Sequence, residues 1–210
     1  MSLEKYYPLG DYDEGSQFSL NEAEWHSYLS AVDVEAGKFL RLFILIRHVS
    51  NHLDIIFSKM RWNKVFVGKK ISSYDDDIDV TTFHKNPINI ASKALFFFAE
   101  KIWGMLLKSC DKVLAEDCWK LSTSMHLIHV EMISAVASMD TFEYLLALCH
   151  FKNAVAGVQR MLSILPSFCK FDEDFPGFNK DISIVLFDLR ELAWCGIAMC
   201  KSASVGQEDD

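Results

Sequence analysis

The residues of this sequence best suited to chemistry lie in one short stretch, RHVSNH, from Arg47 to His52. Histidine can exchange a proton near neutral pH, and arginine can stabilise the negative charge of a phosphate. The stretch interrupts an apolar run, which is typical of a helix packed against a core. Its residues are therefore candidates for a proton-transfer site, for part of a metal site, or for the polar border of a packed helix.

We expect the stretch to lie within one long helix that begins near Asp33 and ends at Met60. Successive residues of a helix are about 100° apart, so its faces can be assigned. The predicted core face holds Leu42, Leu45, Ile46, Val49, Leu53, Ile56, Phe57 and Met60. The opposite, solvent-facing side holds Arg47, Ser50, Asn51, Asp54 and Ser58. Arg41, His48 and His52 fall on the border between the two faces, so this arginine and the two histidines are the predicted combination for any chemistry.

The spacing of Arg47, His48 and His52 resembles the Arg-x4-His active-site motif of the HEPN family of small all-α ribonucleases. The resemblance implies a metal-independent ribonuclease of toxin or defence type, in which two copies of the motif form one cleft. In that chemistry the histidine would transfer protons and the arginine would stabilise the phosphate charge. The candidate catalytic residues under this alternative are Arg41, Arg47, His48 and His52.

Two histidine pairs have the spacing of metal ligands on one side of a helix: His48 with His52, and His126 with His129. Neither pair has the Glu-x-x-His pattern of a di-iron bundle, so only a site that combines both pairs stays open. The acidic run DDDID at 75–79 lacks the glycine and glutamate of a calcium loop. Nucleophile elbows and phosphate-binding glycine loops are also missing from the sequence. We therefore assign no metal and no cofactor.

Helical patterns fill most of the chain and predict an all-α fold, a single-domain bundle of about six helices with an irregular insertion at about 61–86. The expected helices cover about 21–32, 33–60, 87–114, 119–138, 141–165 and 180–200. Capping boxes at SLNE (19–22) and DTFE (140–143) and the pair Asn86-Pro87 predict three of the starts. Asn179 or Asp181 is expected to cap the last helix, and Pro166 to end the one before it.

The composition indicates a chain that folds around a hydrophobic core alone. Half of the 210 residues are hydrophobic, which is enough for a core without disulfides or metals. Six cysteines lie among apolar residues without CxxC spacing, which favours reduced core residues of a cytoplasmic protein. No signal-peptide pattern or membrane-length apolar run is present. We expect a flexible arm at 1–18, a helical domain at 19–202 and a disordered acidic tail at 203–210.

These features favour a non-catalytic helical interaction or regulatory protein, acting as a subunit of a homo- or hetero-oligomeric assembly. The net charge of −8 repels polyphosphate, so we expect a protein partner or self-association, and nucleic acid only under the ribonuclease alternative. Aromatic residues in irregular segments present a partner surface or plug the ends of the bundle: Trp62, Phe66, Tyr74, Phe168, Phe171, Phe175 and Phe178. A binder of a small apolar ligand between helices is the third alternative.

Overall fold

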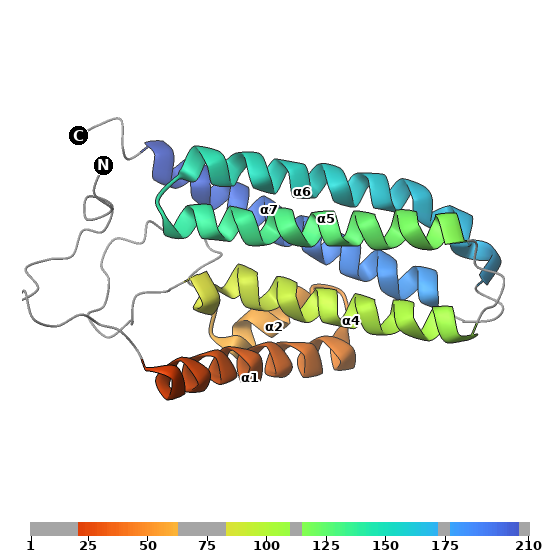
Figure 1. Cartoon of the computed structure of the whole chain (residues 1–210), viewed down its shortest axis with the longest axis horizontal. Helices are drawn as coiled ribbons and strands as arrows, with labels where there is room; N and C mark the ends of the chain where they lie inside the picture. The colour runs from red at the N-terminus through yellow and green to blue at the C-terminus, as the bar shows by residue number, and fades with distance from the viewer. Residues whose placement is uncertain (1–20, 63–82, 110–114, 172–176, 206–210) are drawn as a thin grey trace, which may run out of the picture.

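The computed structural model describes residues 21–62, 83–109, 115–171 and 177–205. Within these ranges the chain forms six α-helices and two 3-10 helices, which confirms the all-α bundle. Helices α4 (Pro87–Ser109), α5 (Ala115–Asp140), α6 (Tyr144–Ile164) and α7 (Phe178–Val205) form a four-helix bundle, and α1 (Glu22–Ile46) with α2 (His52–Met60) packs along its α4 side (Figure 1). The 3-10 helices are η2 (Phe83–Lys85) and η3 (Leu165–Phe171). The predicted arm, most of the insertion and the end of the tail lie outside the described residues.

Two helix starts lie where the capping patterns predict them. Asn21 caps α1: its Oδ1 accepts the N–H of Glu24 at 3.0 Å, and the Glu24 carboxylate accepts the N–H of Asn21 at 2.8 Å. The capping box is therefore formed by Asn21 and Glu24 instead of Ser19 and Glu22. Asn86 accepts the N–H of Ile88 at 2.9 Å, and Pro87 is the first residue of α4. A proline at this position loses no hydrogen bond, because the first turn has no intrahelical acceptor for its N–H.

The DTFE segment closes α5 instead of opening α6, so the capping box predicted there is wrong. The N–H of Glu143 donates to Ser138 O at 2.8 Å, and the N–H of Phe142 donates to Met139 O at 3.1 Å. These two bonds form a Schellman motif, which satisfies the last carbonyls of a helix. Phe142 occupies the left-handed position of that motif, with φ 60°. The prediction for α7 is also wrong, since the helix begins at Phe178 and Asp181 lies inside its first turn.

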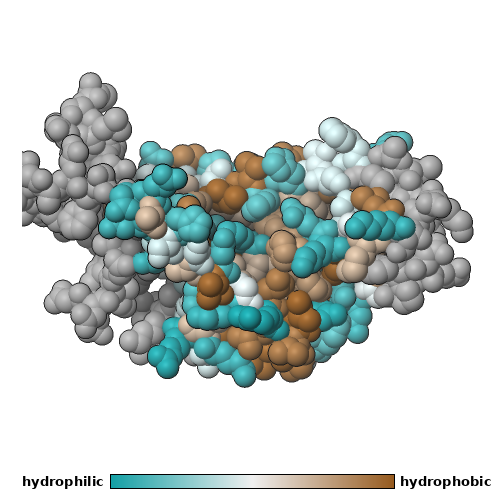
Figure 2. Space-filling model, turned by 60° about the horizontal axis from the view of Figure 1, so that its bottom comes forward, coloured by the Kyte–Doolittle hydropathy of each residue, from teal (hydrophilic) through white to brown (hydrophobic). Residues whose placement is uncertain are grey.

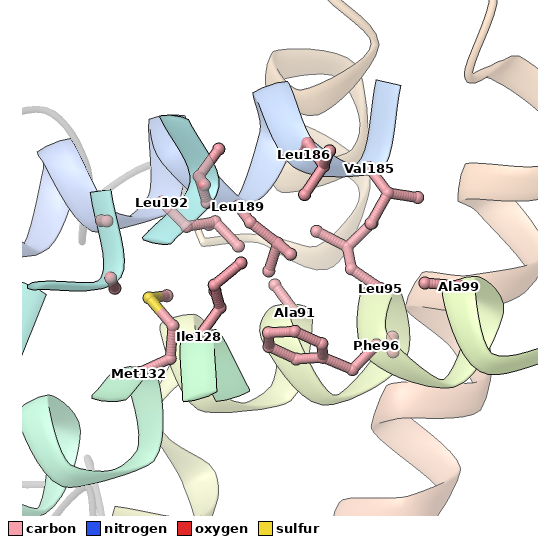
Figure 3. Close-up of a cluster of buried hydrophobic side chains, with 14 of the residues drawn as sticks. Ala91, Leu95, Phe96, Ala99, Ile128, Met132, Val185, Leu186, Leu189 and Leu192 are labelled. Atoms are coloured by element: carbon pink, nitrogen blue, oxygen red, sulfur yellow. The ribbon is translucent and has the colours of Figure 1, made fainter. Parts of the chain in front are cut away.

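The core is formed by apolar side chains of the four bundle helices together with the buried stripes of α1 and α2. Figure 3 shows Leu95 and Phe96 of α4, Ile128 and Met132 of α5, and Leu189 and neighbouring residues of α7 converging on one region. The most extensive contacts between helices are those of α5 with α6 and of α6 with α7. Gly196 allows the second of these, because a Cβ there would lie 2.3 Å from the ring of Phe151.

The predicted long helix is broken between Ile46 and His52, which corrects the faces assigned to it. The buried stripe of α1 is Val32, Ala36, Phe39 and Phe43, and that of α2 is Leu53, Ile56 and Phe57. On one continuous helix the centres of these stripes would be roughly 75° apart, so a single helix could not bury both. With the turn, α1 packs against α4 and α2 folds back against α1, and both stripes are buried. Leu45 and Val49, which were expected in the core, are exposed as a result.

The cysteines and the membrane prediction can be compared with the described part of the chain. Cys200 is buried and Cys195 is half-buried, but Cys149 is exposed on α6, so it is not the core residue that was expected. The side chains of the other three cysteines lie outside the described residues. None of the described helices combines the length and the hydropathy that a bilayer crossing requires.

Candidate polar site at the α1–α2 turn

The RHVSNH stretch forms the turn between α1 and α2. Arg47 is the C-cap of α1, and its N–H still donates to Phe43 O at 2.8 Å. Asn51 adopts the left-handed conformation with φ 58°, and α2 begins at His52. Asparagine tolerates this conformation better than most residues, and serine and asparagine favour helix ends over helix interiors. Ser50-Asn51 was therefore the sequence signal for the break.

Arg47 is paired with Asp181 on α7. Its Nε donates to Oδ1 at 2.9 Å and its Nη2 to Oδ2 at 3.2 Å, a two-point contact that only the guanidinium fork can make. Its Nη1 donates to Ile44 O at 2.6 Å, and the guanidinium lies 5.4 Å from the centre of the Phe98 ring. Arg47 therefore points inward to the bundle, and its predicted solvent-facing orientation is wrong.

His48 lies beside the same carboxylate. Its Nε2 is 3.7 Å from Asp181 Oδ1, the oxygen that also accepts from Arg47 Nε. The imidazole of His48 is 45% exposed, whereas the Arg47 side chain is 19% exposed. Of the side chains of Arg47, His48 and His52, that of His48 is therefore the most exposed to solvent.

His52 is paired with a second carboxylate of α7, Asp188. Its Nε2 lies 2.8 Å from Asp188 Oδ2, and its Nδ1 lies 3.1 Å from the carbonyl oxygen of Val49. A carbonyl only accepts, so Nδ1 must donate to it, and the proton between Nε2 and Asp188 can reside on either group. Burial raises the pKa of Asp188 to about 6, and the hydrogen bond and charge of His52 oppose this rise. Asp188 therefore keeps its proton to a higher pH than an exposed aspartate does.

The two ion pairs hold Arg47 and His52 apart. Their carboxylate partners are seven residues apart on α7, a separation of about 10 Å along the helix axis. In this arrangement the guanidinium and the imidazole cannot both contact one phosphate group. Together, the two ion pairs attach the α1–α2 turn to two positions on α7 that lie two helix turns apart.

Arg41 does not join the two histidines, contrary to the predicted combination. It lies on the exposed side of α1, about 200° around the helix from both Phe39 and Phe43. His52 lies on the core side, where its ring centre is 6.0 Å from that of Phe43. The border shared by Arg41, His48 and His52 existed only on a continuous helix, which the break at 47–51 removes.

The second histidine pair lies elsewhere. His126 and His129 line a groove between α4 and α5, and the His129 ring lies 4.3 Å from the centre of Phe96. Burial lowers the pKa of His129, which favours its neutral form. In the part of the chain that the structure describes, no three histidine, cysteine, aspartate or glutamate side chains are grouped as metal ligands. The site that would combine the two histidine pairs is therefore not formed by these residues.

The two cysteines of α7 have little nucleophilic character. Burial, together with the negative charges of Glu191 and Asp54, raises the pKa of Cys195 to about 11. Burial also raises the pKa of Cys200 to about 11. Since the thiolate is the reactive form, neither side chain is activated for covalent catalysis.

Asp181 and Asp188 were missed as site residues in the sequence. The sequence did contain a signal: Asp188 lies within the apolar segment ISIVLFDLRELAW, and Asp181 directly precedes it. A spacing of seven residues puts both aspartates on one side of a helix. An aspartate inside an apolar segment indicates a buried partner, because an unpaired buried carboxylate is costly. The sequence does not say which residue that partner is.

Comparisons with family models, with curated proteins and with solved structures gave no match to this chain.

Arg47→Ala is expected to lower the free energy of unfolding by about 2 kcal/mol, because it leaves Asp181 half-buried without its main partner. Arg47→Lys keeps the charge but not the two-point contact, and we expect about half of that loss. Urea unfolding followed by circular dichroism measures both. Arg41→Ala is the control, with an expected change below about 0.5 kcal/mol. Equal stability of the Arg47→Ala and Arg41→Ala variants would show that the α7 contact contributes nothing.

Proposed function

We propose that this protein is a non-catalytic interaction protein that assembles with a second copy or another chain through the apolar surface at the start of α6. The observation that carries the proposal is Phe142. This large aromatic side chain has a left-handed backbone conformation and is nevertheless 55% exposed. A non-glycine residue in this conformation costs about 1 kcal/mol, and strain of this kind persists most often where it has a use.

Phe142 belongs to a group of exposed apolar side chains, which we call the α6 patch: Phe142, Leu145, Leu146 and Cys149. Leu145 and Leu146 lie four and three residues before Cys149 in α6, so these three side chains share one face of the helix, and Phe142 lies two residues before its first residue. Leu145 is 71% exposed. Single exposed apolar residues are ordinary on a protein surface, but contiguous ones are typical of binding surfaces.

Other exposed hydrophobic side chains support an assembled protein. Leu45 at the end of α1 is 78% exposed, and Trp119 on α5 is 74% exposed. On the side of the molecule that carries α1, Figure 2 shows hydrophobic side chains grouped among hydrophilic ones. Aromatic side chains are enriched at interface cores, where they contribute most of the binding energy. The α6 patch is the group that we select for testing, because within the described ranges only Phe142 is an exposed aromatic residue with a left-handed backbone.

Phe142→Gly is expected to make the isolated chain more stable and its assembly weaker. Glycine relieves the left-handed strain, for a gain of about 0.5–1 kcal/mol in the free energy of unfolding after its own entropy cost. Loss of the aromatic ring is expected to weaken association at least tenfold. Thermal unfolding measures the first effect. Sedimentation velocity of the 24.0 kDa chain, and of complexes purified with it, measures the second.

Arg61→Gly is the matched control for this experiment. Arg61 also occupies a left-handed position in a Schellman motif, with φ 62°, and its side chain is exposed. The same gain in stability is expected there, but association should be unchanged. A wild-type chain that stays monomeric and purifies without a partner that Phe142→Gly releases would refute the proposal.

A second candidate function, a HEPN-like metal-independent ribonuclease, is favoured by one observation. The RHVSNH stretch lies at the start of a helix, and Arg47 and His48 approach the same carboxylate from neighbouring positions. With His48 exposed, this pair could act on a phosphate if Asp181 released the guanidinium. The two ion pairs to α7 argue against it, since both carboxylates repel RNA and hold Arg47 and His52 at positions two helix turns apart on α7.

His48→Ala separates the two candidates. The imidazole of His48 is exposed, so its loss is expected to leave the stability of the fold within about 0.5 kcal/mol. A ribonuclease would cleave RNA in EDTA and lose that activity in the variant. Our first proposal predicts no cleavage by either protein.

A further inference from the structure

A groove of about 230 Å³ lies between α4 and α5. Its floor consists of buried apolar side chains: Ala99, Leu121, Met161 and Ile182. These two helices make much less contact with each other than α5 makes with α6, so the bundle is open on this side. An apolar cavity of about 150 Å³ accepts a benzene ring, so this groove has room for one ring and a short chain.

The rim of the groove is polar and carries one carboxylate. Glu100 on α4 is exposed, and Ser122, His126 and His129 of α5 lie across from it. The hydroxyl of Ser122 already accepts a hydrogen bond from the indole N–H of Trp103, at 3.1 Å. A mostly apolar concave site with a few polar groups at its edge is the usual form of a small-molecule site.

The charges around the rim select the sign of the ligand. Among the described residues that line the groove, Glu100 is the only acidic one, and none is a lysine or an arginine. Two lysines of α4 lie nearby in the chain and both have partners: the Nζ of Lys93 is held by Asp33 at 2.6 Å, and the Nζ of Lys101 lies 4.5 Å from the centre of the Phe97 ring. Burial lowers the pKa of His129, an effect that the charge of Glu100 opposes, so the neutral imidazole is favoured. A carboxylate ligand would meet repulsion from Glu100, whereas an ammonium group would meet attraction.

We propose that this groove binds a small primary amine, with its apolar body on the floor between α4 and α5 and its ammonium group at the carboxylate of Glu100. Phe96 and Trp103 supply aromatic walls, which suit both the apolar body and a neighbouring cation. The site is distinct from the α6 patch and from the RHVSNH turn, and it does not depend on either proposed function. It assigns a role to the His126–His129 pair as hydrogen-bonding rim residues instead of metal ligands.

The probe is 2-phenylethylamine, compared with 2-phenylethanol and 3-phenylpropionate, which have similar apolar bodies and a neutral or negative head. Chemical-shift titration of the labelled full chain at pH 7 measures each dissociation constant. We expect about 1 mM for the amine, a value reasonable for a ligand of this size. Binding should be about fivefold weaker for the alcohol and weakest for the acid, as a partly exposed charge pair predicts.

Glu100→Gln should reduce binding of the amine to the level of the alcohol and leave the alcohol unchanged. Glu143→Gln is the matched control, since this exposed glutamate is the N-cap of α6 and does not line the groove, and it should change neither value. Ala99→Leu fills the floor and should abolish binding of all three probes. The proposal is overturned if the amine does not bind, if the three heads bind equally, or if Glu100→Gln binds the amine as the wild type does. Because Glu100 is exposed, its substitution tests the site even if the Ala99 variant fails to fold.

Discussion

Gly196→Ala is expected to destabilise the protein by about 2–4 kcal/mol, one of the largest effects of a single methyl group in this fold. The new Cβ would lie 2.3, 2.4 and 2.7 Å from three atoms of the Phe151 ring. Phe151 is fully buried at the contact between α6 and α7, so its ring can move only by disturbing that contact. The loss is measured by urea unfolding, monitored by circular dichroism.

Gly37→Ala is the matched control for this substitution. A Cβ at Gly37, in the middle of α1, meets no atom within 4 Å. Alanine is the better helix former, so this variant should be more stable by about 0.5–1 kcal/mol. Phe151→Leu should recover part of the loss in the Gly196→Ala background, because it removes the ring atoms that collide. Equal stability of the Gly196→Ala and Gly37→Ala variants would contradict the close approach of α6 and α7 at Gly196.

The stability of Asp188→Asn relative to wild type is expected to increase by about 2–3 kcal/mol between pH 4 and pH 7.5. Burial raises the pKa of Asp188 from 3.8 to about 6, so between these values the folded protein binds a proton that the unfolded chain has released. The wild type therefore loses the contribution of this group as the pH rises through 6. Asparagine has no proton to lose, so the variant escapes that loss.

This difference is measured by urea unfolding of both proteins at several pH values. Asp140→Asn, at the exposed end of α5, is the control, and its difference from wild type should vary by less than about 0.5 kcal/mol. His52→Ala provides a second check, since removal of the group that lowers the pKa of Asp188 should make the variant weakest at high pH. A pH-independent difference between Asp188→Asn and wild type would contradict the burial of this carboxylate.

The two ion pairs to α7 give the α1–α2 unit a defined position. The unit packs on the bundle mainly through contacts of α1 with α4, and apolar packing alone allows neighbouring registers of similar energy. Arg47–Asp181 and His52–Asp188 are satisfied in one register only. Buried ion pairs often contribute little net stability but can specify one arrangement over others. We therefore interpret the polar residues of the RHVSNH stretch as structural, in agreement with the non-catalytic function proposed above.

Local signals predicted the elements of this fold well where one residue decides the outcome. Pro87 starts α4 because its ring suits the first turn, and the helix after Asp140 ends before Pro166. The local signals failed where one sequence pattern fits two different structures. DTFE fits a capping box, yet Phe142 and Glu143 complete the end of α5. The Arg-x4-His spacing likewise predicted that Arg47 and His52 share one site, but each residue has its own partner on α7, Asp181 or Asp188.

The sequence by itself determined that this protein is an all-α bundle, because helical periodicity and helix caps depend on residues close together in the chain. Only the tertiary structure decided what the RHVSNH stretch does. The orientation of Arg47 and His52 depends on a break that buries two apolar stripes at once, and on carboxylates more than 130 residues later in the chain. The groove at Glu100 and the exposure of Phe142 also depend on which helices become neighbours, and no local pattern contains that information.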